Sequence, residues 1–412
     1  MPIEPHRRHH KLRCSMSRLL VILLVSLILM IALLIALLQR TETTTAKPPP
    51  YDFVEYWSAA RLLWQGRNPY DMQSLEPLQV EAGRNAEDGP LPMLNPPYVL
   101  PLIMFLGLFP SSVALLIWLI VLFAVMIFTS DAIYRFYGGP DSFRLVAIAV
   151  GLSFVPTLSA LTIRQISPLL LLGTWMFLVL IRGRRDGWAG AATVLLAIKP
   201  HVCYLVWFAI LLWSVQTRRW RVIAGGVFAG LTLTALASAF RPTLVVDYVE
   251  RMRLPLNAYE SPVWGTLLRH ALGGLDSTPF VLQYVPVLFG IAWMAFAWPH
   301  LREKDWPQTL PVLIIMSLLT APYGAWLFDL VLLLLPLLHL LARLLTERKY
   351  IPVFAVLHGT IAATLLTTIM IGTRYIALIW VTPVIGMLYL LGLSLVGGDA
   401  SETRKPTPAI HT

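Results

Sequence analysis

The stretch YDFVEYWSAARLLWQGRNPYD, residues 51–71, guides the interpretation of the whole chain. Asp52 stands where a helix would begin and Gly66 where it would end. Apolar residues recur between them at spacings of three and four, namely Phe53, Tyr56, Trp57, Ala60 and Trp64. Polar residues fall mostly on the other face, namely Glu55, Ser58, Arg61 and Gln65. We therefore expect a helix that lies along a membrane surface and aims its first turn at a bound ligand.

Two interpretations fit the acidic residues of this first turn. The pattern Asp52-x-x-Glu55 is typical of a capping box, in which both side chains satisfy backbone amides at the start of a helix. The spacing alone favours this structural role. The alternative is that Asp52 stands at the mouth of a site and acts as a reactive carboxylate.

The composition is that of a membrane protein with several spans. Of the 412 residues, 57% are hydrophobic and only 13% are charged, and the mean hydropathy is +0.70. The net charge of +10 is best explained by basic cytoplasmic loops, and we see no nucleic-acid-binding module. The two cysteines, Cys14 and Cys203, allow neither a disulfide framework nor a thiolate metal site.

The amino-terminal region predicts a retained membrane anchor. Residues 1–18 are basic, and residues 19–38 form an uncharged apolar run without a small-x-small cleavage site. We expect residues 1–18 in the cytoplasm and the loop 39–97, which holds the opening stretch, on the outer face. Residues 19–396 then form one membrane domain, followed by a cytoplasmic tail at 397–412.

The apolar runs predict an all-α fold with about twelve transmembrane helices. Residues 98–109 are too short to span and are broken by Pro101, so we expect them to be re-entrant or interfacial. This choice places most lysines and arginines in the cytoplasm. The runs 187–198, 200–216 and 308–321 are short, which suits broken helices that line a cavity. The predicted spans are 19–38, 111–134, 144–163, 168–181, 187–198, 200–216, 220–240, 279–298, 308–321, 324–345, 351–371 and 375–396.

Three motifs resemble those of glycosyltransferase family 87, a member of the C-type superfamily of membrane glycosyltransferases. They are D-F-x-x-Y-W-x-A-x-x-L-L-x-x-G-x-N-P-Y-D in the opening stretch, AIKPHVCYL at 197–205 and APYGAWLFDLVLLLLP at 321–336. Residues 95–97 and Arg164-Gln165 echo the family more weakly. The chain departs from it at Phe328, where members often carry histidine or tyrosine, and at Arg164, where they often carry glycine.

The resemblance implies an inverting transferase that acts on the outer face of a bacterial plasma membrane. Its donor would be a sugar, which we expect to be mannose, on a polyprenyl phosphate, and its acceptor a hydroxyl of a glycolipid or glycan. A carboxylate must then accept the hydroxyl proton, and cations must stabilise the leaving phosphate. We expect neither a metal nor a cofactor, and no nucleic acid as a partner.

The expected topology brings the polar residues of these motifs to one side of the membrane. Asp52 is the candidate base, and Lys199 and then Arg164 are the candidates for the phosphate, with His201 as a helper. Structural roles remain open, because Lys199 and Arg164 could reach the interface from helix ends and Asp329 could be the buried partner of one of them. The remaining candidates for substrate binding are Glu55, Tyr56, Trp57, Tyr70, Gln165, Tyr323, Asp329 and Arg374.

A flippase or transporter of a lipid-linked sugar is the main alternative function. Such a protein would also carry charges at membrane depth and broken helices, here at 187–216 and 308–345. A purely structural membrane scaffold is a further alternative, but it would leave the convergence of charged residues unexplained.

Overall fold

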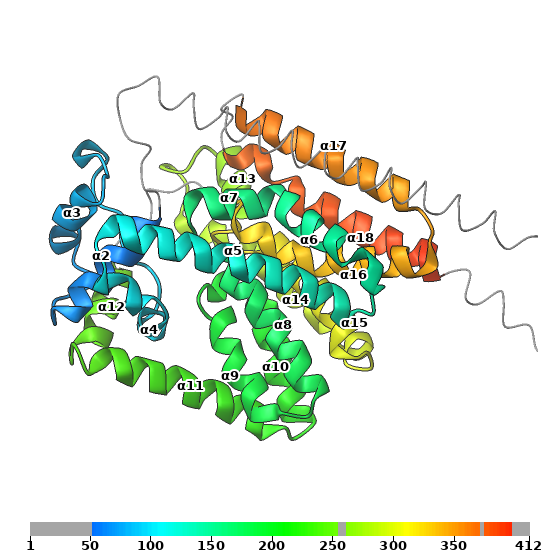
Figure 1. Ribbon diagram of the computed structural model, residues 1–412, viewed down its shortest axis with the longest axis horizontal. Coiled ribbons are helices and arrows are strands. Elements are labelled where there is room, and N and C mark those ends of the chain that lie inside the picture. Colours follow the sequence, from blue (N-terminus) through cyan, green and yellow to red (C-terminus); the bar gives the residue numbers. More distant parts are fainter. Residues whose placement is uncertain (1–51, 254–260, 371–374, 398–412) are drawn as a thin grey trace, which may run out of the picture.

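The computed structural model describes residues 52–253, 261–370 and 375–397, and these residues form helices and turns without a strand. Most of the helices form one bundle, and α2, α3 and α12 gather at one end of the molecule (Figure 1). The first half contains α2 Phe53–Trp64, α3 Met72–Glu81, α4 Leu100–Ile103, α5 Ser111–Phe136, α6 Arg144–Ser153, α7 Val155–Ile163, α8 Pro168–Arg182 and α9 Asp186–Leu196. The second half contains α10 Tyr204–Gln216, α11 Trp220–Ser238, α12 Leu244–Arg253, α13 Trp264–Ala271, α14 Val285–Leu301, α15 Trp306–Leu319, α16 Leu334–Glu347, α17 Ile351–Met370 and α18 Val381–Gly397.

The helices fall where the apolar runs predict them. Each predicted span from residue 111 onward coincides with one helix or with two consecutive ones. The span 144–163 is divided into α6 and α7, which bend by 59° at Phe154. Pro156 lies in the first turn of α7, where its missing N–H is tolerated, and its ring disfavours a continuous helix through the bend.

The count of twelve membrane helices is not confirmed. Within the described part of the chain, six helices are long and apolar enough to cross a membrane, or seven if the bent pair α6 and α7 is one span. Shorter apolar helices include α8, α10 and α15, and α9 has only 11 residues. The predicted anchor at 19–38 lies outside the described residues.

The expectation of a one-sided surface helix for the opening stretch is wrong. Helix α2 begins and ends close to the predicted residues, but it is buried on almost all sides by α3, α5 and the segment 97–108. Ser58, assigned to the polar face, is fully buried, whereas Trp64, assigned to the apolar face, is 40% exposed. Helical spacing cannot reveal that a second layer of protein covers the polar face.

The segment Pro97–Leu108 is a short series of helical turns that comprises two 3-10 turns and α4. It packs against α2 and α11. The side chains of Arg61 and Trp64 donate hydrogen bonds to the carbonyl oxygens of Gly107 and Met104, at 2.9 and 2.7 Å. The segment is therefore part of the support for α2.

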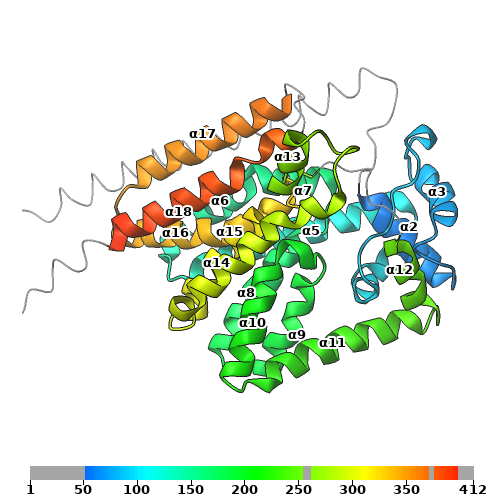
Figure 2. The ribbon, with the colours of Figure 1, turned by 180° about the vertical axis from the view of Figure 1, so that it is seen from behind.

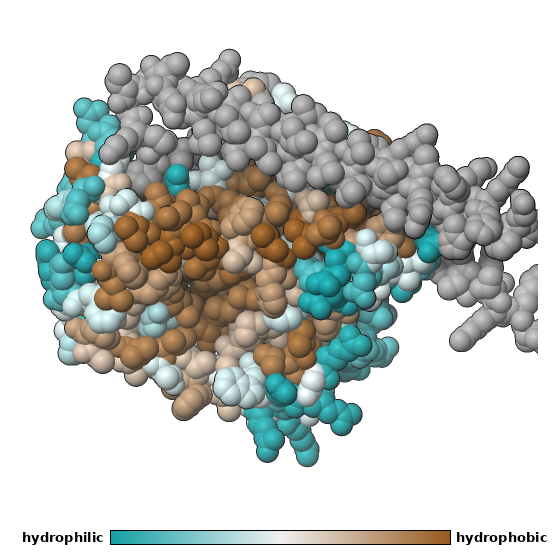
Figure 3. All heavy atoms as spheres, viewed as in Figure 1, coloured by the Kyte–Doolittle hydropathy of each residue, from teal (hydrophilic) through white to brown (hydrophobic). Residues whose placement is uncertain are grey.

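The surface has an apolar region flanked by polar edges, as expected of a protein that lies in a membrane (Figure 3).

Several helix ends meet at the edge remote from α2. Tyr137, just after α5, donates a hydrogen bond to the carbonyl oxygen of Pro307 at 2.9 Å, and the Arg182 guanidinium lies 5.4 Å from the ring centre of Phe136. Figure 2 shows the same arrangement of the helices from behind.

Glycines bring α9 and α11 into close contact. A methyl group added at Gly225 would lie 2.0 Å from the carbonyl oxygen of Gly187, and one added at Gly190 would lie 1.9 Å from that of Val222. Gly230, on the same helix as Gly225, has open space around it. Small residues at such positions allow helix backbones to approach closely in membranes.

We expect Gly225→Ala to lower the stability of the folded protein by about 1–3 kcal/mol, because the added methyl group would overpack the contact. Gly230→Ala is the matched control, since it adds the same methyl group to the same helix without a clash and improves helix propensity. Thermal unfolding in detergent measures the stability of both variants. Equal stability of the two variants would contradict the importance of this contact.

Candidate active site

The first turn of α2 is attached to the end of α7. The backbone N–H of Asp52 donates a hydrogen bond to the carbonyl oxygen of Ile163 at 3.2 Å. The Asp52 carboxylate accepts a hydrogen bond from the side-chain amide of Gln165, whose oxygen accepts one from the Tyr56 hydroxyl. The Asp52 side chain makes no capping hydrogen bond to α2. The capping interpretation is therefore wrong, and the carboxylate faces α7 and α8.

A left-handed residue places Gln165 next to Asp52. Arg164 ends α7 with φ +60°, a conformation uncommon for residues other than glycine. Its carbonyl oxygen accepts a hydrogen bond from the indole of Trp118 at 2.9 Å. The next backbone N–H, of Gln165, returns to the carbonyl oxygen of Ala160 at 2.8 Å. The reversal of the chain at Arg164 thus turns the Gln165 amide toward α2.

The turn between α9 and α10 supplies Lys199. Two side chains hold the carbonyl groups just before it: Asn95 donates to Ile198 O at 3.2 Å, and the Tyr98 hydroxyl donates to Ala197 O at 2.7 Å. The Lys199 ammonium lies 2.7 Å from Asp329 Oδ1 and 3.2 Å from the Ser167 hydroxyl. Asn95 and Tyr98 therefore fix the backbone that positions the Lys199 side chain.

Asp329 is the buried partner of Lys199. Its side chain is 1% exposed, against 12% for Lys199. It also accepts hydrogen bonds from the Ser167 hydroxyl at 2.7 Å and from the backbone N–H of Trp326 at 3.2 Å. The ring of Phe328 lies 4.5 Å from the Lys199 ammonium, so an aromatic face contributes to holding the cation.

Burial dominates the electrostatics of the carboxylates on α2. It raises the pKa of Asp52 to about 6, even though the Lys199 charge and the Gln165 hydrogen bond lower it. Burial, followed by the neighbouring charge of Asp52, raises the pKa of Glu55 well above its ordinary value of 4.5. Glu55 also accepts a long hydrogen bond of 3.5 Å from the backbone N–H of Leu94. Two carboxyls with raised pKa values beside a cation are typical of a site for proton transfer.

A comparison with known protein families identifies the class of this site. The family model described as glycosyltransferase family 87 matches residues 94–328, more than half of the chain. The chain belongs to glycosyltransferase family 87. Its membership indicates a glycosyltransferase and confirms the family predicted from the three motifs. No curated protein and no solved structure gives a significant match.

The residues matched by the model of glycosyltransferase family 87 include some residues of the site, while others lie before or just after them. Gln165, Lys199, His201 and Tyr323 lie inside the matched residues. Asp52 and Glu55 precede them, and Asp329 follows immediately after them. The contacts of Asp52 with Gln165 and of Asp329 with Lys199 thus join residues outside the match to the family domain.

Other residues predicted for the site of this family 87 protein lie in different places. Trp57 and Tyr70 are buried, and each donates a hydrogen bond of 3.0 Å to a carbonyl oxygen, that of Phe109 and that of Asn95. We assign both a structural role in place of stacking on a sugar. The His201 and Tyr323 rings lie 5.8 Å apart, and Arg374 lies outside the described residues.

Ser167 is the residue of the site that the sequence did not indicate. It bridges Lys199 and Asp329 from the turn before α8. A serine before Pro168 is an ordinary helix start, so only its place two residues after Gln165 could have drawn attention to it. Among the described residues, no group of three histidine, cysteine or acidic side chains is arranged to hold a metal ion.

Proposed function

We propose that this protein is an inverting glycosyltransferase that moves a sugar from a polyprenyl-phosphate donor to a hydroxyl of a glycolipid or glycan on the outer face of the membrane. We expect the sugar to be mannose. The arrangement that carries the proposal is the Asp52 carboxylate, held by Gln165, close to the ion pair of Lys199 and Asp329. Family membership supplies the reaction class.

Asp52 is the base in this reaction. The acceptor oxygen attacks the anomeric carbon and its proton passes to the Asp52 carboxylate, while the bond between the anomeric carbon and the phosphate oxygen breaks. The electron pair of that bond leaves with the polyprenyl phosphate. Attack on the face opposite the leaving group inverts the anomeric centre.

The leaving phosphate gains negative charge and needs a cation near it. Lys199 is our first candidate, because its ammonium retains some exposure while Asp329, Ser167 and Phe328 fix its position. Arg164 is the second candidate. A fixed cation needs little rearrangement during the reaction, which is the basis of electrostatic preorganisation.

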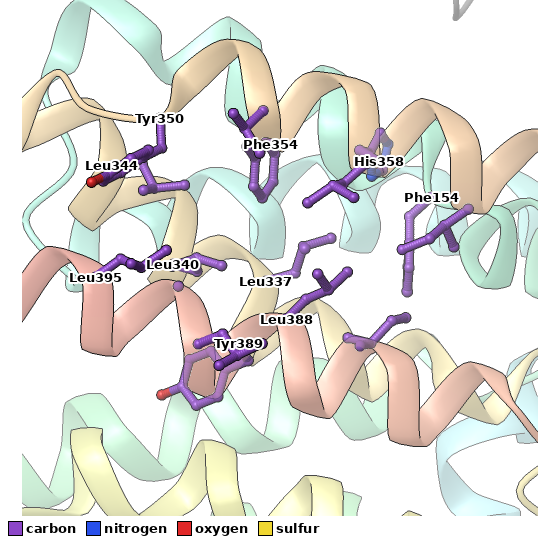
Figure 4. A pocket seen from close by; sticks show the side chains of 16 residues that line it. Phe154, Leu337, Leu340, Leu344, Tyr350, Phe354, His358, Leu388, Tyr389 and Leu395 are labelled. Carbon is purple, nitrogen blue, oxygen red and sulfur yellow. The ribbon is translucent and has the colours of Figure 1, made fainter.

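An apolar cavity supports a lipid-linked donor. It has a volume of about 230 Å³ and lies between α16, α17 and α18, with side chains such as Leu337, Phe354 and Leu388 pointing into it (Figure 4). Helix α16 connects it to the site, since the helical turn that begins at Asp329 leads directly into this helix. We propose that the prenyl chain of the donor occupies the cavity while its phosphate lies near Lys199.

Leu388→Trp should fill this cavity and raise the KM for a long-chain donor about tenfold, which corresponds to ~1.4 kcal/mol, with little change in kcat. Leu390→Trp is the matched control, because Leu390 lies on the same helix, is 54% exposed and does not line the cavity. Donors with long and short prenyl chains should be compared. An equal increase in KM for long-chain and short-chain donors would contradict the binding of the prenyl chain in this cavity.

Purified protein offered radiolabelled polyprenyl-phosphate sugars and, separately, nucleotide sugars tests the proposed function. Total membrane lipid serves as the acceptor. We expect label to reach lipid only from the polyprenyl-phosphate donors, with mannose preferred. Transfer from a nucleotide sugar would contradict the donor class. Movement of the donor across a liposome membrane without transfer would favour the flippase.

A further inference from the structure

Two turns remote from the candidate site place arginines in an unfavourable backbone conformation. Arg184, between α8 and α9, and Arg218, between α10 and α11, both have φ +55°. Each turn closes in the same way: Arg185 N–H bonds to Leu180 O, and Arg219 N–H bonds to Ser214 O, both at 2.8 Å. Such helix ends usually carry glycine at the left-handed position.

The first turn contains a glycine that does not take this position. Gly183 directly precedes Arg184, yet it has φ −78° and leaves the left-handed conformation to the arginine. A strained residue persists only where the surrounding structure or a function retains it. Neither turn is buried, since the Arg184 and Arg218 side chains are exposed. Internal packing therefore does not explain the choice of arginine at either turn.

The two turns are joined and carry a strong excess of positive charge. The Arg219 guanidinium lies 3.0 Å from the Asp186 carboxylate, which connects the start of α11 to the start of α9. Asp186 is the single acidic residue among 182–186 and 218–221, which contain six arginines. Trp188 and Trp220 flank the pair and are 72% and 56% exposed. Exposed tryptophans beside cations are typical of the membrane interface.

The turns lie at the opposite helix ends from the candidate site. Helix α8 leaves the site next to Ser167 and reaches Arg182 after 15 residues, which corresponds to about 22 Å. Helix α9 returns toward Lys199, and α10 leaves again and ends just before Arg218. Both turns therefore lie at the lower end of α8, α9 and α10 in Figure 1.

We propose that the paired turns around Arg184 and Arg218 bind the phosphate groups of anionic phospholipids in the leaflet opposite the candidate site. Guanidinium groups bind phosphate oxygens two at a time, which favours arginine over a point charge. Clusters of basic residues between membrane helices attract anionic headgroups in the same way. The flanking tryptophans lie at the depth of the lipid headgroups and complete the site.

The test uses the double variant Arg184→Gly with Arg218→Gly, which removes the charges and relieves the backbone at the same time. Thermal unfolding is measured in mixed micelles that contain phosphatidylcholine or phosphatidylglycerol. We expect phosphatidylglycerol to raise the melting temperature of the parent by several degrees and to raise that of the variant little. In phosphatidylcholine the variant should be at least as stable as the parent, which excludes a folding defect.

The matched control is the double variant Arg302→Gln with Lys304→Gln. It removes the same charge from exposed residues between α14 and α15, where Arg302 has φ −64°. We expect it to keep the full effect of phosphatidylglycerol. An equal loss in both double variants would reduce the effect to net charge and overturn the proposal, as would a full effect in the glycine variant. A shift of the same size with inorganic phosphate in place of the lipid would also overturn it.

Discussion

Asp52→Asn should lower turnover on the order of 10²- to 10⁴-fold, the usual range for removed acid–base assistance. The substitution keeps the size of the side chain and its ability to accept a hydrogen bond from Gln165. It removes only the capacity to take up a proton. Single-turnover kinetics with a polyprenyl-phosphate sugar, together with a binding measurement, would separate this loss of turnover from a loss of donor affinity.

Asp71→Asn is the matched control for this substitution. Asp71 directly precedes α3 and caps it, because its carboxylate accepts hydrogen bonds from the backbone N–H groups of Gln73 and Ser74 at 3.3 and 3.1 Å. Asparagine also caps helices well, so turnover should remain near that of the parent. Near-parental turnover in a folded Asp52→Asn protein would assign Asp52 to a structural role.

The pKa of Asp52 predicts the pH dependence of the parent enzyme. Burial raises this pKa to about 6, and the base acts in its ionised form. Turnover should therefore rise as the pH increases through about 6 and level off above it. A profile measured from pH 5 to pH 8 would contradict the assignment if turnover were flat or fell over this range.

Lys199→Ala should abolish most turnover and also destabilise the protein by about 3–5 kcal/mol. The reason is that Asp329, 1% exposed, would lose the cation that pairs with it inside the protein. Lys199→Arg retains a charge and should keep partial activity, although the guanidinium has a different shape. Thermal unfolding and donor turnover are measured on the same preparations.

Two further proteins separate the structural from the catalytic part of this effect. Lys199→Met combined with Asp329→Leu removes both charges, so stability should largely return while turnover stays low. Arg343→Ala breaks the exposed pair between Arg343 and Glu347, 3.1 Å apart, and should cost no more than about 1 kcal/mol. Parental turnover in the double variant would end the assignment of Lys199 to the leaving phosphate.

The sequence predicts the helices better than it predicts their surroundings. Continuous apolar runs define α5, α11 and α17 closely, because a membrane helix needs a long apolar segment whatever its neighbours are. The bounds of α2 also follow from Asp52 and Gly66. The burial of α2 on nearly all sides does not, since it depends on residues 97–108 folding back against it.

The contacts of the site are predictable only in part. The sequence offers a structural role for Asp329 as the buried partner of a cation, because a carboxylate within an apolar run needs a partner. It does not decide between Lys199 and Arg164 as that partner. The hydrogen bond between Gln165 and Asp52 joins residues 113 positions apart. It depends on the left-handed conformation of Arg164, which no local sequence pattern predicts.

The attachment of Asp52 to the end of α7 separates the proposed catalytic residue from the loop that follows α3. The backbone N–H of Asp52 donates to Ile163 O, and its carboxylate accepts from Gln165, both at the end of α7 in the membrane bundle. The tip of the loop after α3, residues 85–88, is exposed, and none of its residues takes part in these two hydrogen bonds. In evolutionary terms, the proposed function allows the loop tip to diverge toward new acceptors while Asp52 keeps its two hydrogen bonds to the bundle.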